Sequence, residues 1–422
     1  MSFTATLECA RGLDEADVLA GFRERFEMPH DAHGTPLIYL CGHSLGLMPR
    51  AARTLVTQEL DDWGSLGVLG HESARRPWIP YHENFVAGLA ELTGARAHEV
   101  VAMNSLTVNL HLMLAAFYHP RGKRRKILIE AGAFPSDRHA IASQLEWHGL
   151  DPHRTLIELA PTAREDAVSE EEIEGMLQQL GAEIALVLWP GVQYRTGQAF
   201  DLARIASAAH RARCLVGFDL AHSIGNTQPA LALSGADFAV WCSYKYLNAG
   251  PGAIGGCFIH ERHLGTASRS HLAGWWGHEP TTRFLMRPEF HAAAGAAGWQ
   301  LSNPSVLSAA PLIASLEIFS EARLVRLRAK SLQLTGFLEF LLEHLAPAVR
   351  IITPAEPAER GCQLSLRVDG ARHVFERLGA AGVVCDWREP DTLRVAPVPL
   401  YNRFEDVWRF SERLVQVLGS TA

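Results

Sequence analysis

The chain has 422 residues, of which 48% are hydrophobic, and its formal net charge is −7. This length supplies a large core for about two or three domains. Because nucleic-acid binding needs a basic excess, the acidic balance argues against a nucleic-acid partner.

The cysteines and the N-terminal sequence favour a cytoplasmic protein. The seven cysteines are odd in number and form no C-x-x-C pair, which fits a reducing compartment better than a disulfide framework. The first residues carry early acids and no apolar segment flanked by positive charge, unlike a secretory signal. No stretch reaches about 18 uninterrupted apolar residues, so we expect no membrane span and no membrane partner.

Strands and helices alternate through the middle of the chain. The predicted strands are 126–130, 183–189, 214–218, 238–243 and 253–259, and the predicted helices are 136–147 and 202–213. This alternation predicts an α/β fold in which βαβ units build a mainly parallel sheet covered by helices on both faces.

The C-terminal part of the chain has a different pattern. Residues 309–345 are predicted to be helical, and short strands at 363–368 and 392–395 and helices at 371–378 and 405–418 follow. This order predicts a separate, smaller α+β domain that the N-terminal segment completes, with a boundary near residue 320.

Two segments place polar or aromatic side chains near the start of a helix. In NSLTVNLH (104–111), Thr107 can cap the helix, or the helix start can bind phosphate through its free N–H groups. In EAGAFPSD (130–137), the ring of Phe134 can lie over a flat cofactor. Alternatively, Phe134 belongs to the core and Asp137 only occupies the first turn of the next helix.

Asp219 ends an apolar strand in CLVGFDLAHSIG (214–225), and His222 follows three residues later. A carboxylate at the carboxyl end of a strand lies where open α/β sheets bind ligands. Capping of the following turn by Asp219 is the alternative.

Lys245 follows an apolar strand in FAVWCSYKYLNAG (238–250) and precedes a glycine-rich loop. Burial disfavours an ammonium group, lowers its pKa and makes a nucleophile that can form a Schiff base with a carbonyl or with pyridoxal phosphate (PLP). PLP enzymes place an acidic partner of the pyridine nitrogen near this lysine, and Asp219 lies 26 residues earlier. A lysine that extends from the strand end into water is the alternative.

Arg394 stands in an apolar strand within LRVAPVPLYN (393–402). Such an arginine needs an anionic partner. A substrate carboxylate held by two hydrogen bonds and a structural salt bridge explain it equally well.

The motifs of this chain resemble those of the kynureninases, which are PLP enzymes of the aspartate-aminotransferase group. The matching segments follow the same order along nearly the whole chain: IYLCGHSLGLMPR (38–50), GHESARRPW (70–78), NSLTVNLHLML (104–114), AFPSDRHAIASQ (133–144), FDLAHSIGN (218–226), VWCSYKYLNAGPGAIGG (240–256), GWWGHEP (274–280), LSNPSVL (301–307) and RVAPVPLYN (394–402). The resemblance implies PLP-dependent transferase fold type I and a homodimer with active sites at the subunit interface. It implies a large PLP-binding domain (46–320) with a mainly parallel seven-stranded sheet, a small α+β domain (321–422), and an N-terminal segment (1–45) that packs on the small domain.

The resemblance also implies roles for individual residues. Lys245 would form the Schiff base, Asp219 would partner the pyridine nitrogen, and Tyr244, acidified by the phosphate network and by Lys245, would be a general base. The cofactor-binding positions are Leu106, Thr107, Phe134, Asp137, Asp219, His222, Tyr244, Lys245, Trp275 and Asn303, of which Trp275 and Asn303 would reach in from the second subunit. The substrate-binding positions are Ser44, His71, Ser302, Asn303 and Arg394, with Arg394 on the α-carboxylate.

The implied reaction is hydrolytic Cβ–Cγ cleavage of L-kynurenine or 3-hydroxy-L-kynurenine to L-alanine and an anthranilate, in tryptophan degradation and NAD biosynthesis. His71, Ser302 and Asn303 resemble the set found in members that prefer the 3-hydroxy substrate. A site built to bond a hydroxyl group penalises a substrate without one, so we predict this preference.

Two departures and several alternatives accompany this interpretation. Pro190 stands where a small hydroxyl residue is expected, and His43 stands where asparagine is common. The alternative functions are another fold type I enzyme, such as an aminotransferase or a desulfurase, or a non-catalytic binding protein. A desulfurase needs a mobile cysteine, and Cys362 is not on an obvious flexible loop. The scattered histidines show no metal-ligand spacing, so we expect no metal.

Overall fold

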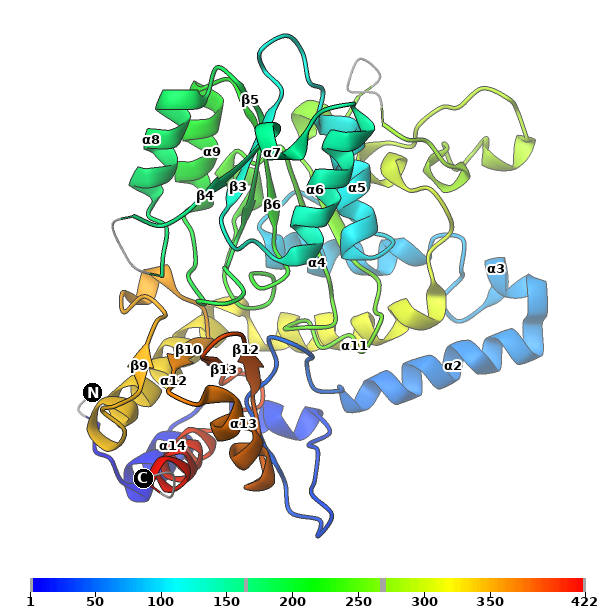
Figure 1. Ribbon diagram of the computed structural model, residues 1–422. Helices are drawn as coiled ribbons and strands as arrows, with labels where there is room; N and C mark the ends of the chain where they lie inside the picture. The colour runs from blue at the N-terminus through cyan, green and yellow to red at the C-terminus, as the bar shows by residue number, and fades with distance from the viewer. Residues whose placement is uncertain (1–2, 163–165, 266–270, 420–422) are drawn as a thin grey trace.

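The computed structural model describes residues 3–162, 166–265 and 271–419. A large α/β domain and a smaller domain lie side by side, and a helical arm extends from the large domain (Figure 1).

The large domain is built on a seven-stranded sheet, as predicted. Its strand order is β2-β8-β7-β6-β5-β3-β4. Only β8 runs antiparallel to its neighbours β2 and β7. The strands are β2 (Val100–Ala102), β3 (Lys126–Glu130), β4 (Leu156–Leu159), β5 (Ile184–Pro190), β6 (Leu215–Asp219), β7 (Phe238–Trp241) and β8 (Gly256–Ile259).

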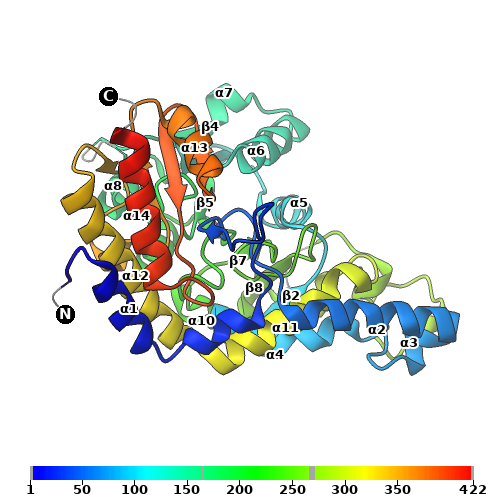
Figure 2. The ribbon, with the colours of Figure 1, turned by 90° about the horizontal axis from the view of Figure 1, so that it is seen from below.

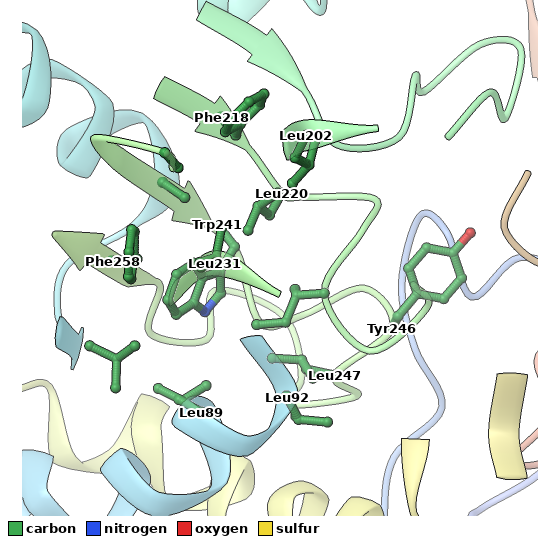
Figure 3. Packing of buried hydrophobic residues seen from close by; sticks show 14 of the residues in the cluster. Leu89, Leu92, Leu202, Phe218, Leu220, Leu231, Trp241, Tyr246, Leu247 and Phe258 are labelled. Atoms are coloured by element: carbon green, nitrogen blue, oxygen red, sulfur yellow. The ribbon is translucent and has the colours of Figure 1, made fainter. Parts of the chain in front are cut away.

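Helices cover both faces of this sheet, which explains why its inner strands are apolar without alternation. One face packs against α4 (Val86–Thr93), α8 (Glu170–Leu180), α9 (Leu202–Arg211), α10 (Leu231–Ser234) and α11 (Val306–Ala322). The other face packs against α5 (Leu106–Phe117) and α6 (Pro135–Trp147), and the short helix α7 (Pro152–Thr155) follows α6. Figure 3 shows the first of these cores, in which Trp241, Phe258 and Leu231 pack together.

The smaller domain has its own core and its own sheet. The antiparallel sheet has the order β12-β13-β10-β9. Its strands are β9 (Arg350–Ile351), β10 (Leu364–Arg367), β12 (Asp386–Arg388) and β13 (Thr392–Val395), and its helices are α12 (Leu324–Leu345), α13 (Ala371–Ala380) and α14 (Phe404–Gly419). The N-terminal segment adds α1 (Leu7–Glu15) and β1 (Ile38–Tyr39), which pairs with β11 (Val383–Val384). Ala10, Ile38 and Leu40 belong to this second core.

The helix predicted over 309–345 is two helices. Arg323 separates α11 from α12 and has a φ of 65°. An α-helix cannot continue through this backbone conformation, so the chain changes direction between the domains.

The arm consists of α2 (Arg50–Leu66) and α3 (Gly70–Ser73). The long helix α2 packs against α11 and then extends beyond the body of the protein (Figure 2). Leu60, Trp63, Val68 and Leu69 on and next to this arm are exposed. In soluble proteins, exposed apolar groups of this kind often mark interaction surfaces.

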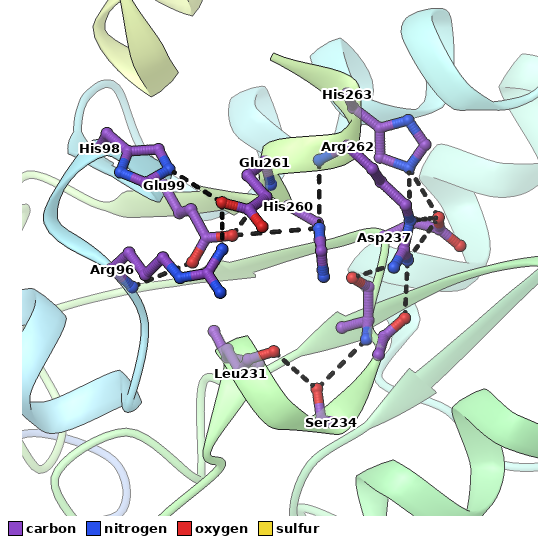
Figure 4. A network of polar contacts seen from close by, with 12 residues as sticks. Arg96, His98, Glu99, Leu231, Ser234, Asp237, His260, Glu261, Arg262 and His263 are labelled. Atoms are coloured by element: carbon purple, nitrogen blue, oxygen red, sulfur yellow. Dashed lines mark hydrogen bonds and ion pairs between the residues drawn. The ribbon is translucent and has the colours of Figure 1, made fainter.

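A charged cluster closes the amino end of the sheet. Asp237, just before β7, accepts hydrogen bonds from Arg262 Nη2 and His263 Nε2, both at 2.7 Å (Figure 4). Its other oxygen lies 3.0 Å from His210 Nε2 and accepts the N–H of Val216 at 2.8 Å. Asp237 therefore holds the ends of β6 and β7 together.

Among the residues described, no helix is both long enough and apolar enough to cross a membrane.

Candidate active site

One cavity at the carboxyl ends of the strands brings together most of the predicted site residues. These residues come from the start of α5, the start of α6, the end of β6 and the loop after β7. They are Leu106, Thr107, Phe134, Asp137, Asp219, His222, Tyr244 and Lys245. This is the edge at which open α/β sheets bind ligands.

Lys245 is directed at the interior of the cavity. Strand β7 ends at Trp241, so the lysine lies in the following loop and not at the strand end itself. Its Nζ donates a hydrogen bond to His222 Nε2 at 2.9 Å and lies 5.7 Å from the centre of the Phe134 ring. The side chain therefore does not extend into water, as the alternative interpretation required.

His222 is buried and neutral. Burial lowers the pKa of the imidazole well below its usual value, and the charge of Lys245 lowers it further. Because Nε2 accepts from Lys245, the proton of the ring is on Nδ1. This Nδ1 has no hydrogen-bond partner among the described residues.

Asp219 and Asp137 form an acidic pair in the cavity. Asp219 Oδ1 accepts the N–H of Ala221 at 2.7 Å, so this residue also caps its turn. Burial raises the pKa of Asp137 well above its usual value, and the adjacent Asp219 raises it further. Within the described chain, Asp137 Oδ1 has no hydrogen-bond partner. A buried carboxyl group without a donor, beside a second carboxyl group, fits the protonated ring nitrogen of PLP.

The start of α5 fits the phosphate end of the same cofactor. The helix begins at Leu106, and its N-cap Ser105 makes no side-chain capping bond, so its first N–H groups remain available for an anion. Thr107 is therefore not the cap of this helix, which was the alternative to phosphate binding. Its Oγ1 instead lies 2.8 Å from Ser136 Oγ, at the start of α6, which brings two hydroxyl groups to the end of the cavity.

Phe134 is not a core residue, because 42% of its surface is exposed. Its ring meets Tyr194 edge-on, with 5.3 Å between ring centres and 82° between ring planes. A face of the ring therefore remains free for a flat cofactor.

Tyr244 lines the cavity, and in the protein without the phosphate on which its predicted acidification depends, the pKa of its hydroxyl group is raised. Burial raises the pKa of its hydroxyl group above the usual value, and the neighbouring Cys242 raises it further. The hydroxyl group therefore keeps its proton at neutral pH.

Glu130 is a cavity residue that the sequence analysis did not single out. It is buried at the end of β3, and burial raises the pKa of its carboxyl group to about 8. Its Oε2 lacks a hydrogen-bond partner in the part of the chain that the structure describes. The argument applied to Asp219 would have found it, because it also ends a predicted strand. Pro190, the departure noted above, lines the same cavity.

Ser44 and Arg394 lie together beside this cavity. Arg394 is buried, and its Nη2 donates to Ser44 Oγ at 3.2 Å. The same guanidinium group forms a salt bridge with Asp386, whose Oδ2 is 2.6 Å from Nη2. The salt-bridge alternative is therefore present in the structure, and Asp386 is a second residue that the sequence analysis missed.

Gly46 ties the N-terminal segment to the loop of Lys245. Its N–H donates to the carbonyl of Tyr244 at 2.8 Å. A Cβ atom at this position would lie 2.3 Å from both Lys245 O and Asn248 Oδ1. Only glycine allows this close approach.

The other predicted substrate residues lie elsewhere in the chain. His71 and Asn303 line a second cavity, which is formed by the arm and the start of α11, together with Trp78. The rings of His71 and Trp78 meet edge-on at 5.4 Å. Ser302 is exposed next to Asn303.

Trp275 is also separate from the Lys245 cavity. It is half-exposed, and its Nε1 donates to the carbonyl of Arg283 at 3.1 Å. Among the described residues, the lining of the Lys245 cavity includes neither Trp275 nor Asn303.

Cys362 does not have the properties of a desulfurase nucleophile. It is buried, and burial raises the pKa of its thiol to about 12. A reactive cysteine is accessible and has a lowered pKa.

Comparison with known proteins agrees with this site. Residues 327–414 match the family described as the kynureninase C-terminal domain. The chain is 55% identical over 410 residues to a kynureninase of Xanthomonas campestris pv. campestris (strain B100), with 96% of each chain covered. A kynureninase of Myxococcus xanthus (strain DK1622) is 53% identical over 407 residues, again with 96% of each chain covered.

Solved structures with lower identity share the fold. The cysteine desulfurase CsdA from Escherichia coli has a TM-score of 0.75 and 19% identity, with 95% of this chain and 98% of that chain covered. The cystine C–S lyase C-DES, in complex with cysteine persulfide, has a TM-score of 0.76 and 19% identity, with 90% and 97% covered. From its fold, its full-length similarity and a cavity that fits PLP, the chain belongs to the kynureninase family of PLP-dependent hydrolases.

Proposed function

We propose that Lys245, Asp219 and Tyr244 are the catalytic residues of the kynureninase reaction in this chain. The observation that carries this proposal is the convergence of the Lys245 amine, the neutral His222 and the Asp137–Asp219 pair in one cavity. Borohydride reduction of the holoenzyme followed by peptide mapping tests it. We expect the label on Lys245, and a label on any other lysine would contradict the proposal.

Different residues of the cavity hold or transfer different protons in the proposed reaction. PLP, when bound, supplies an electron sink for the α-carbon of the substrate. The Asp137–Asp219 pair holds a proton at the ring nitrogen, and Lys245 Nζ takes the α-proton of the substrate as general base. Tyr244 keeps its proton, because burial raises the pKa of its hydroxyl group, and acts as a hydrogen-bond donor toward the phosphate or the reacting carbonyl.

The remaining cavity residues hold the cofactor in place. The N–H groups at Leu106 and Thr107 and the Thr107 hydroxyl group would bind its phosphate, Phe134 would stack on its ring, and His222 would contact it. Arg394 and Ser44 bind the α-carboxylate of the substrate. Support for these roles comes from the free helix start, the exposed ring of Phe134 and the buried guanidinium group.

A second copy of the chain completes each active site in this proposal. Trp275 and Asn303 are cofactor-binding positions by resemblance, yet both lie outside the described lining of the Lys245 cavity. The second cavity also contains Trp63 and Leu307, which are 60% and 41% exposed. Apolar groups beside a specificity pocket fit a homodimer in which each arm covers the site of its partner.

Mixed dimers test this arrangement. Lys245→Ala removes the reactive amine, and Asn303→Trp fills the second cavity, so each variant alone should be inactive. If the two residues belong to different subunits at one site, a mixed dimer has one intact site, and random mixing restores about a quarter of the full activity. No recovery after mixing, with dimers present, would show that each chain forms its site alone.

We further propose that the enzyme prefers 3-hydroxykynurenine to kynurenine. His71 and Asn303 meet in one cavity, where an imidazole and an amide can bond the ring hydroxyl group. We expect kcat/KM to favour the hydroxylated substrate by about tenfold or more. His71→Phe and Asn303→Ala should each reduce this ratio toward one. Equal kcat/KM values for the two substrates with the unchanged enzyme would refute the preference.

The proposal also covers the domain boundaries and the cellular location of the chain. We propose a division into an N-terminal segment (1–45), a large domain (46–320) and a small domain (321–422), because Ala10 and Ile38 pack in the core of the small domain. We propose a cytoplasmic location, because all seven cysteines are free thiols.

A further inference from the structure

The guanidinium group of Arg394 is already occupied within the protein. Its Nε donates to Asp386 Oδ1 at 2.9 Å, and its Nη2 donates to Asp386 Oδ2 at 2.6 Å. Its Nη1 donates to the carbonyl of Tyr194 at 2.7 Å, and its Nη2 also donates to Ser44 Oγ at 3.2 Å. An arginine has five N–H groups, so these four bonds leave one N–H group, on Nη1, for a further acceptor.

The register of the small sheet places Asp386 in this position. In the antiparallel pair of β12 and β13, Asp386 is directly opposite Arg394. Directly opposite residues are neighbours on one face of the sheet. While this pair is intact, Arg394 cannot hold a substrate carboxylate through the same two N–H groups.

The cluster around Asp386 has more positive than negative charge. Asp386 Oδ2 also accepts from Arg388 Nη2 at 3.0 Å and from Ser44 Oγ at 2.7 Å. Two guanidinium groups therefore share one carboxylate. The adjacent His43 is neutral, because burial lowers its pKa and the charge of Arg394 lowers it further. A second carboxylate can therefore join the cluster without displacing the first.

We propose that Asp386 is a positioning residue for substrate binding. It fixes the guanidinium group of Arg394 so that the Nη1 edge binds the substrate α-carboxylate end-on. Nη1 donates to the carbonyl of Tyr194, a residue that lines the Lys245 cavity, so this edge is joined to the lining of that cavity. The inference rests on the role proposed above for Arg394. It adds that this role depends on Asp386, a residue of the small domain.

Asp386→Asn tests this inference in the holoenzyme, because the amide keeps the shape of the side chain but loses the charge that holds Arg394. We expect KM for kynurenine to rise about tenfold, while kcat changes less than about threefold and the visible absorbance of bound PLP is unchanged. In an Arg394→Gln background, the same substitution should raise KM no further, because Asp386 acts through this arginine.

Asp391→Asn is a matched control. Asp391 pairs with Arg367 at 2.9 Å and with Arg195 at 3.7 Å. Its substitution therefore also removes an acidic partner from nearby arginines, but it leaves the pair of Arg394 and Asp386 intact. This control should leave KM unchanged. Asp386→Glu keeps the charge and shifts it by one methylene group, so it should also raise KM in a protein that retains its ion pair.

The outcomes separate this inference from the proposed role of Arg394. If Arg394→Gln raises KM but Asp386→Asn and Asp386→Glu do not, the positioning role of Asp386 is wrong and the role of Arg394 stands. A lower KM in Asp386→Asn would also overturn it, because Asp386 would then compete with the substrate. An unchanged KM in Arg394→Gln would overturn the carboxylate-binding role itself.

Discussion

Buried carboxylates lie at both ends of the central sheet, but their surroundings differ. At the amino end, Asp237 accepts hydrogen bonds from Arg262, His263, His210 and the N–H of Val216. These partners hold the pKa of Asp237 below its usual range, although burial alone would raise it. The carboxylate is therefore ionised, paired and structural.

At the carboxyl end, the buried acids are less completely paired. Asp137 Oδ1 and Glu130 Oε2 have no hydrogen-bond partner among the described residues, and burial raises the pKa of both groups. Such groups cost stability unless a ligand supplies the missing donor. The comparison indicates that this protein pairs the buried carboxylate that supports the fold, and leaves buried carboxyl oxygens unpaired where they line the Lys245 cavity.

The largest expected effect tests the carboxyl end. Lys245→Ala should lower kcat by at least about a thousandfold, because it removes the proposed base. The melting temperature should not fall, because Lys245 forms no salt bridge with an acid among the described residues. Steady-state kinetics and thermal unfolding measure the two effects. Lys126→Ala, at the start of β3, is the control and should keep full activity, whereas residual turnover above a few per cent in Lys245→Ala would place the base elsewhere.

The next effect belongs to the amino end. Asp237→Asn should lower the free energy of unfolding by about 3 kcal/mol at neutral pH, because it removes the buried charge that pairs with Arg262 and accepts from the two histidines. The folded protein should keep its kcat, because Asp237 lies at the opposite end of the strands from the cavity. Urea unfolding measures the free energy of unfolding, and kinetics below the melting temperature measure kcat. A loss of kcat without a loss of stability would show that Asp237 is not a purely structural residue.

The same substitution has a defined pH dependence. Because the folded pKa of Asp237 is lowered, its contribution is fully present above the unfolded pKa of about 3.9 and is lost as the pH falls toward the folded value. The stability difference between Asp237→Asn and the unchanged protein should therefore be constant near neutral pH and shrink below about pH 4.

A smaller effect is expected from Tyr244→Phe. Loss of the hydroxyl group should lower kcat about tenfold, because one hydrogen-bond donor to the reacting groups is removed. The shape of the pH–rate profile between about pH 6 and pH 9 should not change, because the raised pKa keeps the hydroxyl group protonated in this range. Loss of a titration in this range would instead show that Tyr244 ionises during the reaction, and full activity would remove it from the mechanism.

The smallest effect has the opposite sign. Asp137→Asn should raise the free energy of unfolding of cofactor-free protein by about 1 kcal/mol at pH 7, because it removes a buried carboxyl group that resists ionisation. The folded pKa of Asp137 is raised, so this cost is absent below the unfolded pKa and grows as the pH rises. The gain should therefore disappear near pH 4, about the unfolded value. An equal or lower stability at pH 7 would show that the acidic pair is not under strain.

Much of the fold could be predicted, because apolar strand runs are long and end at distinctive residues. The strands at 126–130 and 392–395 were predicted with their observed bounds. Asp219 and Lys245 were found for the same reason, since a polar group after a buried strand lies at the ligand-binding edge.

The rest depends on contacts that a sequence does not contain. Strand β12 is short and polar, so neither the strand nor the pairing of Asp386 with Arg394 could be predicted. The burial of Tyr244, which raises the pKa of its hydroxyl group, depends on the packed loop and could not be predicted. His71 and Asn303 lie far apart in the sequence, and only the contact of the arm with α11 brings them into one cavity.

The close contact at Gly46 has a consequence for ligand selection. Ser44 bonds the arginine cluster, and Gly46, two residues later, bonds the loop that carries Lys245. This short stretch of backbone therefore fixes the separation between Arg394, the residue proposed to bind an acid, and Lys245, the residue proposed to bind an amine. A ligand that reaches both side chains must match this fixed separation between its acid and its amine.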